Sequence, residues 1–444
     1  MNSIPFPSRS YDDLPIAESI EFGELLAINL TSSTNPFTHG LHRYPAKFIP
    51  QVPRWAIRQY SRPGDIVLDP FSGSGTTVVE AVAEGRRGFG IDLDPLACLI
   101  GAAKVADYDT ARLREIARGV LQRSQLSAGP PLVPMAGVAN FGHWFSEDAW
   151  SKLQAIKAAI ETVEMSGVER DFFLVVFSSI LRAVSNADDQ TQKTYVSGTL
   201  KKTPPPVQAT FEKRLWRAID SAEELTRARG SGSGVIVHAS ATALPTADES
   251  VDLMVSSPPY LDSVDYMYNL MLEYFWLGSR VGLASRAEFN LARRAGIGSK
   301  QPSNVESTMP ERLSGLIDLD GFPAYRRSVV APYFSGLAQH FGEASRVLKP
   351  GGRYVLVIGN SRTKSGMLPL HDALVALAAD AGLHMEHAFG YRIRRHHMRF
   401  PRKGRGGIIL MDWVITLTKR DSTDAPLRQL PLIDDQLHPD AVAN

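Results

Sequence analysis

Two short segments of this 444-residue chain bring together residue types that can do chemistry. The first, residues 69–77, reads DPFSGSGTT, an acid and an aromatic residue followed by two glycines. Glycine has no Cβ and tolerates positive φ, so such a turn lets the backbone approach a ligand closely, and a helix that begins there points its first amides at the ligand. The second, residues 257–260, reads SPPY and places a hydroxyl and an aromatic ring on a loop whose two prolines fix φ.

Each segment directly follows a run typical of a buried strand, 65–68 before the first and 251–255 before the second. A glycine-rich turn alone is common in nucleotide-binding sheets, and Pro-Pro-Tyr alone also occurs in loops without a function. Open α/β sheets bind ligands at the carboxyl ends of their strands, where the strand order reverses. The two segments in this order, each at a strand end, therefore predict one ligand site that both of them line.

Together the two segments resemble the amino-group DNA methyltransferases, which use S-adenosylmethionine to methylate an exocyclic nitrogen of adenine or cytosine. The resemblance implies an α/β fold with a Rossmann-like methyltransferase sheet. It also implies S-adenosylmethionine as the cofactor and double-stranded DNA as the partner. The enzyme is expected to act either in a restriction–modification system with a cognate restriction endonuclease or in an epigenetic system. The cofactor segment precedes the catalytic segment, so the chain is not permuted as many relatives are.

The resemblance assigns cofactor contacts to the first segment. Asp69 can pair with the α-amino group of S-adenosylmethionine, and Phe71, Gly73, Gly75 and Thr76 form the turn around it.

An acid at the end of the next strand, 88–92, suits the ribose of the cofactor. A carboxylate there can accept both ribose hydroxyls, and we assign this role to Asp92. Asp94 lies two residues further on, and capping of a helix N-terminus is its alternative role.

Two further elements depart from the family pattern. Lys47 lies where relatives often have a Lys-Pro pair, but two residues separate it from Pro50. It either pairs with the cofactor carboxylate or is a solvated lysine before a helix. Ser240 lies where relatives often have an acid that contacts adenine, and it can accept a hydrogen bond from the adenine amine without charge assistance.

The resemblance assigns the methyl transfer to the second segment. An exocyclic amine is a poor nucleophile because its lone pair is delocalised into the base. Ser257 Oγ and the Pro258 carbonyl can accept hydrogen bonds from its two N–H groups, Pro259 stiffens the loop, and Tyr260 can stack on a base flipped out of the duplex. In the family a serine at the first position accompanies cytosine N4 methylation, so cytosine is favoured and adenine N6 is the alternative.

Polar residues after this loop have two possible roles. Asp265, Asn269 and Glu273 recur at helical spacing and share one face. That face either lines the base pocket or is solvated. The single cysteine, Cys98, is interpreted as a core residue.

Positive charge gathers in three stretches that can contact phosphates, of which the one with Lys193, Lys201 and Lys202 is the weakest. A charge run is usually a solvated face, but this class of enzyme must hold DNA. The candidate DNA-binding residues are Arg392, Arg394, Arg395, Arg399, Arg402 and Lys403 in the first stretch and Arg293 and Arg294 in the second.

Periodicity predicts an α/β domain with a helical insertion. We expect an N-terminal arm at 1–34, a catalytic domain at 35–104 and 235–420, a mostly helical insertion and candidate target-recognition domain at 105–234, and a disordered tail at 421–444. The segment at 279–324 is the alternative for target recognition because of its positive charge. The catalytic sheet is expected to be mostly parallel with an antiparallel closing strand. Within the insertion, helices are predicted to begin after Ser146 and at Asp171.

Composition favours a soluble, cytoplasmic enzyme without a metal. No apolar stretch reaches the roughly 18 residues of a membrane span, the N-terminus lacks a secretory pattern, and one cysteine excludes a disulfide framework and a Cys-cluster zinc site. Three other readings are weaker. An RNA methyltransferase usually carries an RNA-binding domain, for which the first 60 residues are too short. A decayed DNA-binding subunit would not keep both segments complete, and nothing in the SPPY loop suits a nicotinamide-dependent oxidoreductase.

Overall fold

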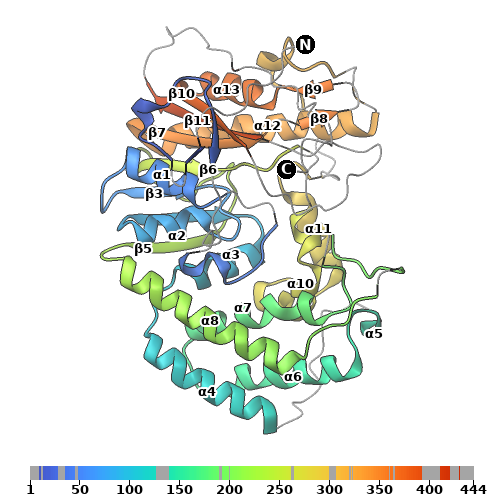
Figure 1. Cartoon of the computed structure of the whole chain (residues 1–444). Coiled ribbons are helices and arrows are strands. Elements are labelled where there is room, and N and C mark those ends of the chain that lie inside the picture. Colours follow the sequence, from blue (N-terminus) through green and yellow to red (C-terminus); the bar gives the residue numbers. More distant parts are fainter. Residues whose placement is uncertain are drawn as a thin grey trace.

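The computed structural model describes residues 10–11, 14–28, 36–45, 49–126, 140–189, 193–199, 201–261, 265–299, 307–319, 322, 324–359, 361–363, 366–392, 411–420 and 430. Figure 1 shows a sheet with flanking helices in the upper part of the molecule and a group of helices, α4 to α8, below it.

The sheet has nine described strands in the order β1-β2-β10-β11-β7-β6-β3-β4-β5. They are β1 (Ser10–Tyr11), β2 (Leu25–Ile28), β3 (Ile66–Asp69), β4 (Arg87–Asp92), β5 (Ser233–His238), β6 (Val251–Ser256), β7 (Leu348–Gly359), β10 (Leu383–Arg392) and β11 (Met411–Lys419). All neighbouring pairs are parallel except those of β11, which is antiparallel to both β7 and β10. The predicted fold class is confirmed. A separate hairpin joins β8 (Ser361–Thr363) to β9 (Gly366–Leu368).

Helices cover both faces of the sheet because alternate strand residues are apolar on opposite sides. Val355 and Val357 of β7 pack in a cluster with Trp55, whereas Leu356 and Ile358 pack against α12 and α13. The helices are α1 (Gln51–Tyr60), α2 (Thr76–Ala83), α3 (Pro95–Val105), α4 (Thr110–Leu126), α5 (Phe141–Trp144), α6 (Glu147–Thr162), α7 (Gly167–Val184), α8 (Val207–Ala228), α9 (Tyr266–Asn269), α10 (Met271–Leu277), α11 (Arg286–Ala295), α12 (Ala324–Val347) and α13 (Leu370–Asp380).

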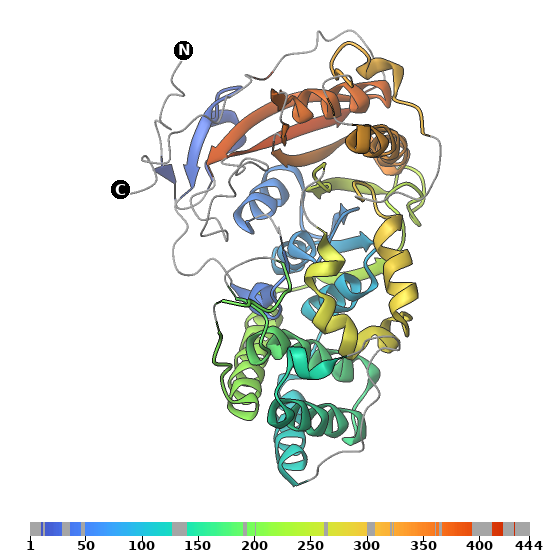
Figure 2. The ribbon, with the colours of Figure 1, turned by 90° about the vertical axis from the view of Figure 1, so that its right-hand side faces the viewer.

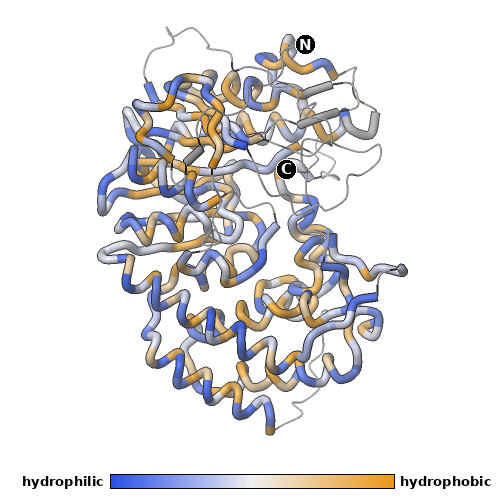
Figure 3. The backbone as a smooth tube through the Cα atoms, viewed as in Figure 1, coloured by the Kyte–Doolittle hydropathy of each residue, from blue (hydrophilic) through white to orange (hydrophobic). Residues whose placement is uncertain are grey.

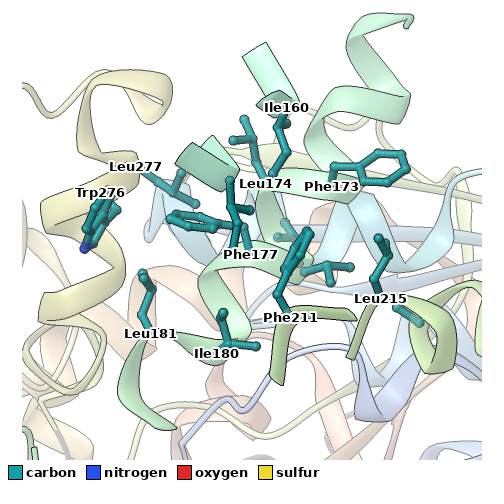
Figure 4. Packing of buried hydrophobic residues seen from close by; sticks show 14 of the residues in the cluster. Ile160, Phe173, Leu174, Phe177, Ile180, Leu181, Phe211, Leu215, Trp276 and Leu277 are labelled. Carbon is teal, nitrogen blue, oxygen red and sulfur yellow. The ribbon is translucent and has the colours of Figure 1, made fainter. Parts of the chain in front are cut away.

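Helices α4 to α8 share one hydrophobic core with residues of α3 and α10. Figure 3 shows hydrophilic and hydrophobic residues alternating along α4 and α8, as expected of helices with one face on a core. Figure 4 shows Phe177 and Leu181 of α7 and Trp276 of α10 among the packed side chains, and the Trp276 ring lies 4.7 Å from that of Trp150. Figure 2 shows α10 and α11, in yellow, beside the bundle helices. The segment after the SPPY loop thus packs into the helical insertion, whose status as a target-recognition domain stays a prediction.

A buried leucine of this core tests its contribution to stability. Leu181 is fully buried and Leu126 is 79% exposed. We expect Leu181→Ala to lower the free energy of unfolding by about 2–5 kcal/mol, because it leaves a cavity, and Leu126→Ala to change it by less than about 0.5 kcal/mol. Urea denaturation of both variants measures this, and equal effects would contradict a shared core.

The helix starts show one success and one error of sequence analysis. The Ser146 hydroxyl accepts from the amide of Ala149 and caps α6, as predicted. The helix predicted to begin at Asp171 begins at Gly167 instead, because Ser166 and the glutamate at position 169 form a capping box.

Two terminal segments also differ from expectation. Residues 25–28, predicted to lie in an arm, form β2, which pairs in parallel with β10 on one side and with β1 on the other. Four apolar residues are too few to show a period, so only pairing with a distant strand reveals this element. In the tail predicted to be disordered, the structure describes Leu430, which is buried beside α12 and α13.

None of the described helices combines the length and the apolar character that crossing a membrane requires.

Candidate active site

The two segments meet at the carboxyl ends of neighbouring strands. β3 and β6 pair in parallel with Leu68 opposite Met254. Beyond this pair, the Ser256 hydroxyl donates to Asp69 Oδ1 over 2.5 Å. The strand order reverses beside β3, where open α/β sheets bind ligands. The glycine turn and the SPPY loop therefore lie at one edge of the sheet.

The glycine turn is tight enough to require both glycines. Gly73 and Gly75 have φ values of +48° and +82°. A Cβ on Gly73 would lie 2.9 Å from Cε1 of the Tyr44 ring, and one on Gly75 would lie 3.3 Å from Cα of Gly101. Thr76 begins α2 directly after the turn, so the first amides of α2 point toward the turn, as predicted from the sequence.

Lys104, which the sequence analysis did not identify, supports this turn. Lys104 of α3 is fully buried, and its Nζ donates to the carbonyl and the hydroxyl of Ser74, each over 2.9 Å. A buried ammonium is costly unless it is hydrogen-bonded, so Lys104 fixes the shape of the turn. Its signal in the sequence is a lone cation within an otherwise apolar helix.

Asp69 is placed to receive a cation. Its side chain is 1% exposed, and Oδ1 accepts from Ser256 and from the amide of Phe71. Burial raises the pKa of Asp69 to about 6, against the opposing effect of the Ser256 hydrogen bond. The second oxygen, Oδ2, is buried without a hydrogen-bond partner among the described residues. The unpartnered Oδ2 suits the α-amino group of S-adenosylmethionine. The tight turn at Gly73 suits close approach of the methionine end of the cofactor.

Asp92 and Asp94 have different roles, as the sequence analysis preferred. Asp94 Oδ1 caps α3 by accepting from the amides of Leu96 and Ala97. The half-buried Asp92 lies at the end of β4 and accepts from the amides of Gly73 and Asp94. Burial, helped by the charge of Asp94, raises the pKa of Asp92 to about 7. Asp92 is thus directly joined to the glycine turn, whereas Asp94 holds a helix.

The adenine-side candidates lie near one another. The Phe71 ring makes an edge contact with the ring of His340 at 4.7 Å, and His340 Nδ1 lies 3.1 Å from the carbonyl of Ala241. The neighbouring Ser240 hydroxyl is 2.8 Å from that of Thr242 and keeps lone pairs for a further donor. Lys47 lies outside the described residues, so its role stays a prediction.

The SPPY loop is held by residues from distant parts of the chain that were not predicted. The Tyr260 hydroxyl donates to Asp412 Oδ1 over 2.9 Å, and the Tyr333 hydroxyl donates to the Pro259 carbonyl over 2.9 Å. Ser257 is half-buried. No local pattern could reveal these partners, because they come from α12 and β11.

The face of Asp265, Asn269 and Glu273 is not solvated as a whole. Asn269 and Glu273 are buried, and burial raises the pKa of Glu273 to about 7. Asp265 caps α9 and pairs with Arg293. Thr194 donates to the Asn269 carbonyl over 2.8 Å, so this segment is tied to the helical insertion.

The candidate DNA-binding residues fall into three groups. Arg293 is held by Asp265 and by contacts with the Tyr268 and Phe289 rings, which leaves it less available to phosphates than expected. Its neighbour Arg294 is exposed. Arg392 ends β10 and is half-buried. The remaining candidates lie outside the described residues: Arg394, Arg395, Arg399, Arg402 and Lys403.

Cys98, interpreted as a core residue, is buried and free of a disulfide. Burial raises its pKa above the usual thiol value, so it is a weak nucleophile.

Replacing Asp92 tests the ribose role. We expect Asp92→Ala to weaken cofactor binding about tenfold or more with little loss of fold, since it removes a contact to two hydroxyls. The pKa near 7 adds a signature: wild-type affinity should fall as pH drops from 8 to 6, because a protonated carboxyl accepts less well. The variant should keep only the smaller fall near pH 6 that comes from Asp69. Calorimetry at pH 8 and 6 measures both. Unchanged affinity would move the role to Asp94 or refute the site.

Comparisons with known proteins agree with this geometry. The family model for DNA methylases of the N6/N4 type matches residues 17–102, which include the glycine turn but not the SPPY loop. Type II methyltransferase M.MvaI of Kocuria varians is 26% identical over 402 residues, covering 84% of this chain and 87% of that protein. Type II methyltransferase M.BsoBI of Geobacillus stearothermophilus is 22% identical over 430 residues, covering 83% and 82%.

The fold was also compared with solved structures. The crystal structure of a SAM-dependent methyltransferase from Methanosarcina mazei aligns with 85% of this chain and 99% of that chain at 12% identity, with a TM-score of 0.28. The fold is therefore assigned from the strand order of the sheet.

Proposed function

We propose that this chain, which belongs to the S-adenosylmethionine-dependent amino-group DNA methyltransferases, methylates the N4 amine of cytosine at a specific sequence in double-stranded DNA. The observation that carries the proposal is the position of Ser257. It directly follows Ser256, the last residue of β6, whose hydroxyl donates to Asp69 Oδ1, so the SPPY loop begins next to a cofactor residue. A serine at this position accompanies cytosine N4 methylation in the family.

Different residues bind the cofactor and position the target base. Asp69 and Asp92 hold the amine and the ribose of S-adenosylmethionine, which supplies an electrophilic methyl group when bound. Ser257 Oγ and the Pro258 carbonyl accept the two N–H groups of the target amine and direct its lone pair, and Tyr260 stacks on the flipped base. The Tyr333 hydroxyl already occupies the Pro259 carbonyl. Orientation supplies most of the rate.

Positive side chains are proposed to hold the DNA. Arg294 on α11 and the basic run that begins at Arg392 are the proposed phosphate contacts. The helical insertion at 105–234 is the proposed target-recognition domain, because α10 links its core to the SPPY loop. A cognate restriction endonuclease is the proposed partner of the system.

Adenine N6 methylation is the alternative, because that amine also needs only acceptors. Mass spectrometry of nucleosides from DNA incubated with the protein and S-adenosylmethionine decides between the bases. N4-methylcytosine is the expected product. N6-methyladenine would overturn the base assignment alone, and no methylated nucleoside would overturn the proposed function.

A further inference from the structure

Tyr333 of α12 bonds to the SPPY loop from inside the core. Its side chain is 1% exposed, and its ring makes an edge contact with that of Phe334 at 5.1 Å. The hydroxyl donates to the carbonyl of Pro259 over 2.9 Å. Burying a hydroxyl is costly unless it is hydrogen-bonded, and a phenylalanine would fill the same space without that cost. The bond to Pro259 is therefore what a tyrosine contributes at this position.

The two prolines restrict every backbone torsion at the start of the loop except one. Each proline ring fixes the φ of its own residue, here Pro258 and Pro259. A proline also restricts ψ of the residue before it, here Ser257 and Pro258. The first torsion that no proline controls is ψ of Pro259. That torsion turns the peptide group between Pro259 and Tyr260, and with it the direction in which the Tyr260 side chain points.

The Tyr333 hydroxyl acts on this torsion. The Pro259 carbonyl oxygen belongs to the peptide group that ψ turns, so rotation would carry it away from the Tyr333 hydroxyl. The far end of the Tyr260 ring is held as well, since its hydroxyl donates to Asp412 Oδ1 over 2.9 Å. Asp412 is buried and also accepts from the Tyr391 hydroxyl over 3.0 Å. Tyr260 is thus held at its backbone and at its hydroxyl, while its side chain stays half-buried.

We propose that Tyr333 is a positioning residue, which fixes ψ of Pro259 and so places the Tyr260 ring to stack on the flipped base. The inference rests on the proposed function, because it takes Tyr260 as the stacking ring. Stacking can orient the target amine toward the methyl group only if the ring itself has a fixed position. Tyr333 acts through Tyr260 and needs no contact with the base or the cofactor.

Removal of one oxygen atom tests this role. Tyr333→Phe keeps the ring in the core and removes only the donor to Pro259. We expect the single-turnover rate of methyl transfer to fall about tenfold, the effect of losing roughly one oriented hydrogen bond, and the dissociation constant of the cofactor to stay within about twofold.

Tyr108→Phe is the matched control for this variant. Tyr108 is 6% exposed, and its hydroxyl donates to the carbonyl of Ala103 over 2.9 Å. It lies in the core that α4 to α8 share with α3 and α10. The control therefore loses the same type of bond from a buried tyrosine, and it should keep the full rate.

A double-mutant cycle separates positioning from support of the fold. In the Tyr260→Ala background no ring remains to be placed, so Tyr333→Phe should change the rate by less than about twofold. A residue that only supported the fold would slow both backgrounds equally. An effect of about tenfold in the Tyr260→Ala background would overturn the inference, as would a wild-type rate in Tyr333→Phe.

A second variant applies if Tyr333→Phe does not fold, which thermal unfolding without the cofactor reveals. Tyr260→Phe keeps the stacking ring and frees its far end from Asp412, so it should also slow transfer about tenfold with unchanged cofactor affinity. A wild-type rate in this variant would show that the ring needs no fixed position and would overturn the inference. The absence of any methylated nucleoside with the wild-type protein would instead overturn the proposed function, which distinguishes the two failures.

Discussion

Ser257→Ala is expected to lower turnover about 100-fold, the effect of removing one oriented hydrogen-bonding group that acts in the transition state. The bond between Ser257 Oγ and the target N–H strengthens as the nitrogen becomes pyramidal, so its loss should appear in kcat and much less in binding. Single-turnover kinetics gives the rate, and calorimetry with the cofactor and anisotropy with DNA give the affinities.

The controls for this prediction are a distant serine and a different acceptor. Ser314→Ala replaces an exposed serine that bonds only to its own turn and should leave the rate unchanged. Ser257→Asp replaces one acceptor by another, so some activity should survive, with adenine gaining relative to cytosine. Wild-type rate in Ser257→Ala would show that the Pro258 carbonyl alone suffices.

Asp69→Asn is expected to weaken cofactor binding about 100-fold, within the range of about 2–5 kcal/mol for truncating a buried hydrogen-bonded charge pair. The amide oxygen can still accept from Ser256 and from the amide of Phe71, so the fold should persist. What disappears is the negative charge beside the unpartnered Oδ2, where the cationic amine is proposed to bind. Calorimetry measures the loss, and thermal unfolding without the cofactor checks the fold.

The pKa of Asp69 adds a pH signature. Because that pKa is raised to about 6, the carboxyl gains a proton as pH falls through 6, and wild-type affinity for the cofactor should drop there. Asp69→Asn should lack this step. Asp65→Asn, at the other end of β3 and outside the site, should bind like the wild type. Unchanged affinity in Asp69→Asn would place the amine elsewhere.

Local sequence determined the parts of the site that lie within one turn of the chain. Asp69, Gly73 and Gly75 could be predicted because a tight strand-to-helix turn admits few residue types, and the observed φ values show that only glycine suits two of its positions. The position of Asp92 beside the glycine turn could be predicted because a carboxylate at the end of the next strand faces the same edge, and its contact with the ribose stays a prediction. The strand periods also predicted that both segments meet at that edge.

Tertiary structure alone decided what holds these parts in place. Lys104 is separated from Ser74 by 30 positions, and Asp412 from Tyr260 by 152, so no spacing in the sequence relates them. Strand β2 and the burial of Glu273 likewise depend on partners that only the folded chain supplies. Sequence patterns report a residue's neighbours within a helix turn or a strand, whereas the hydrogen bonds that orient a reactive loop join elements that meet only on packing. The family of this protein could therefore be predicted from its sequence, and the hydrogen bonds that hold its SPPY loop could not.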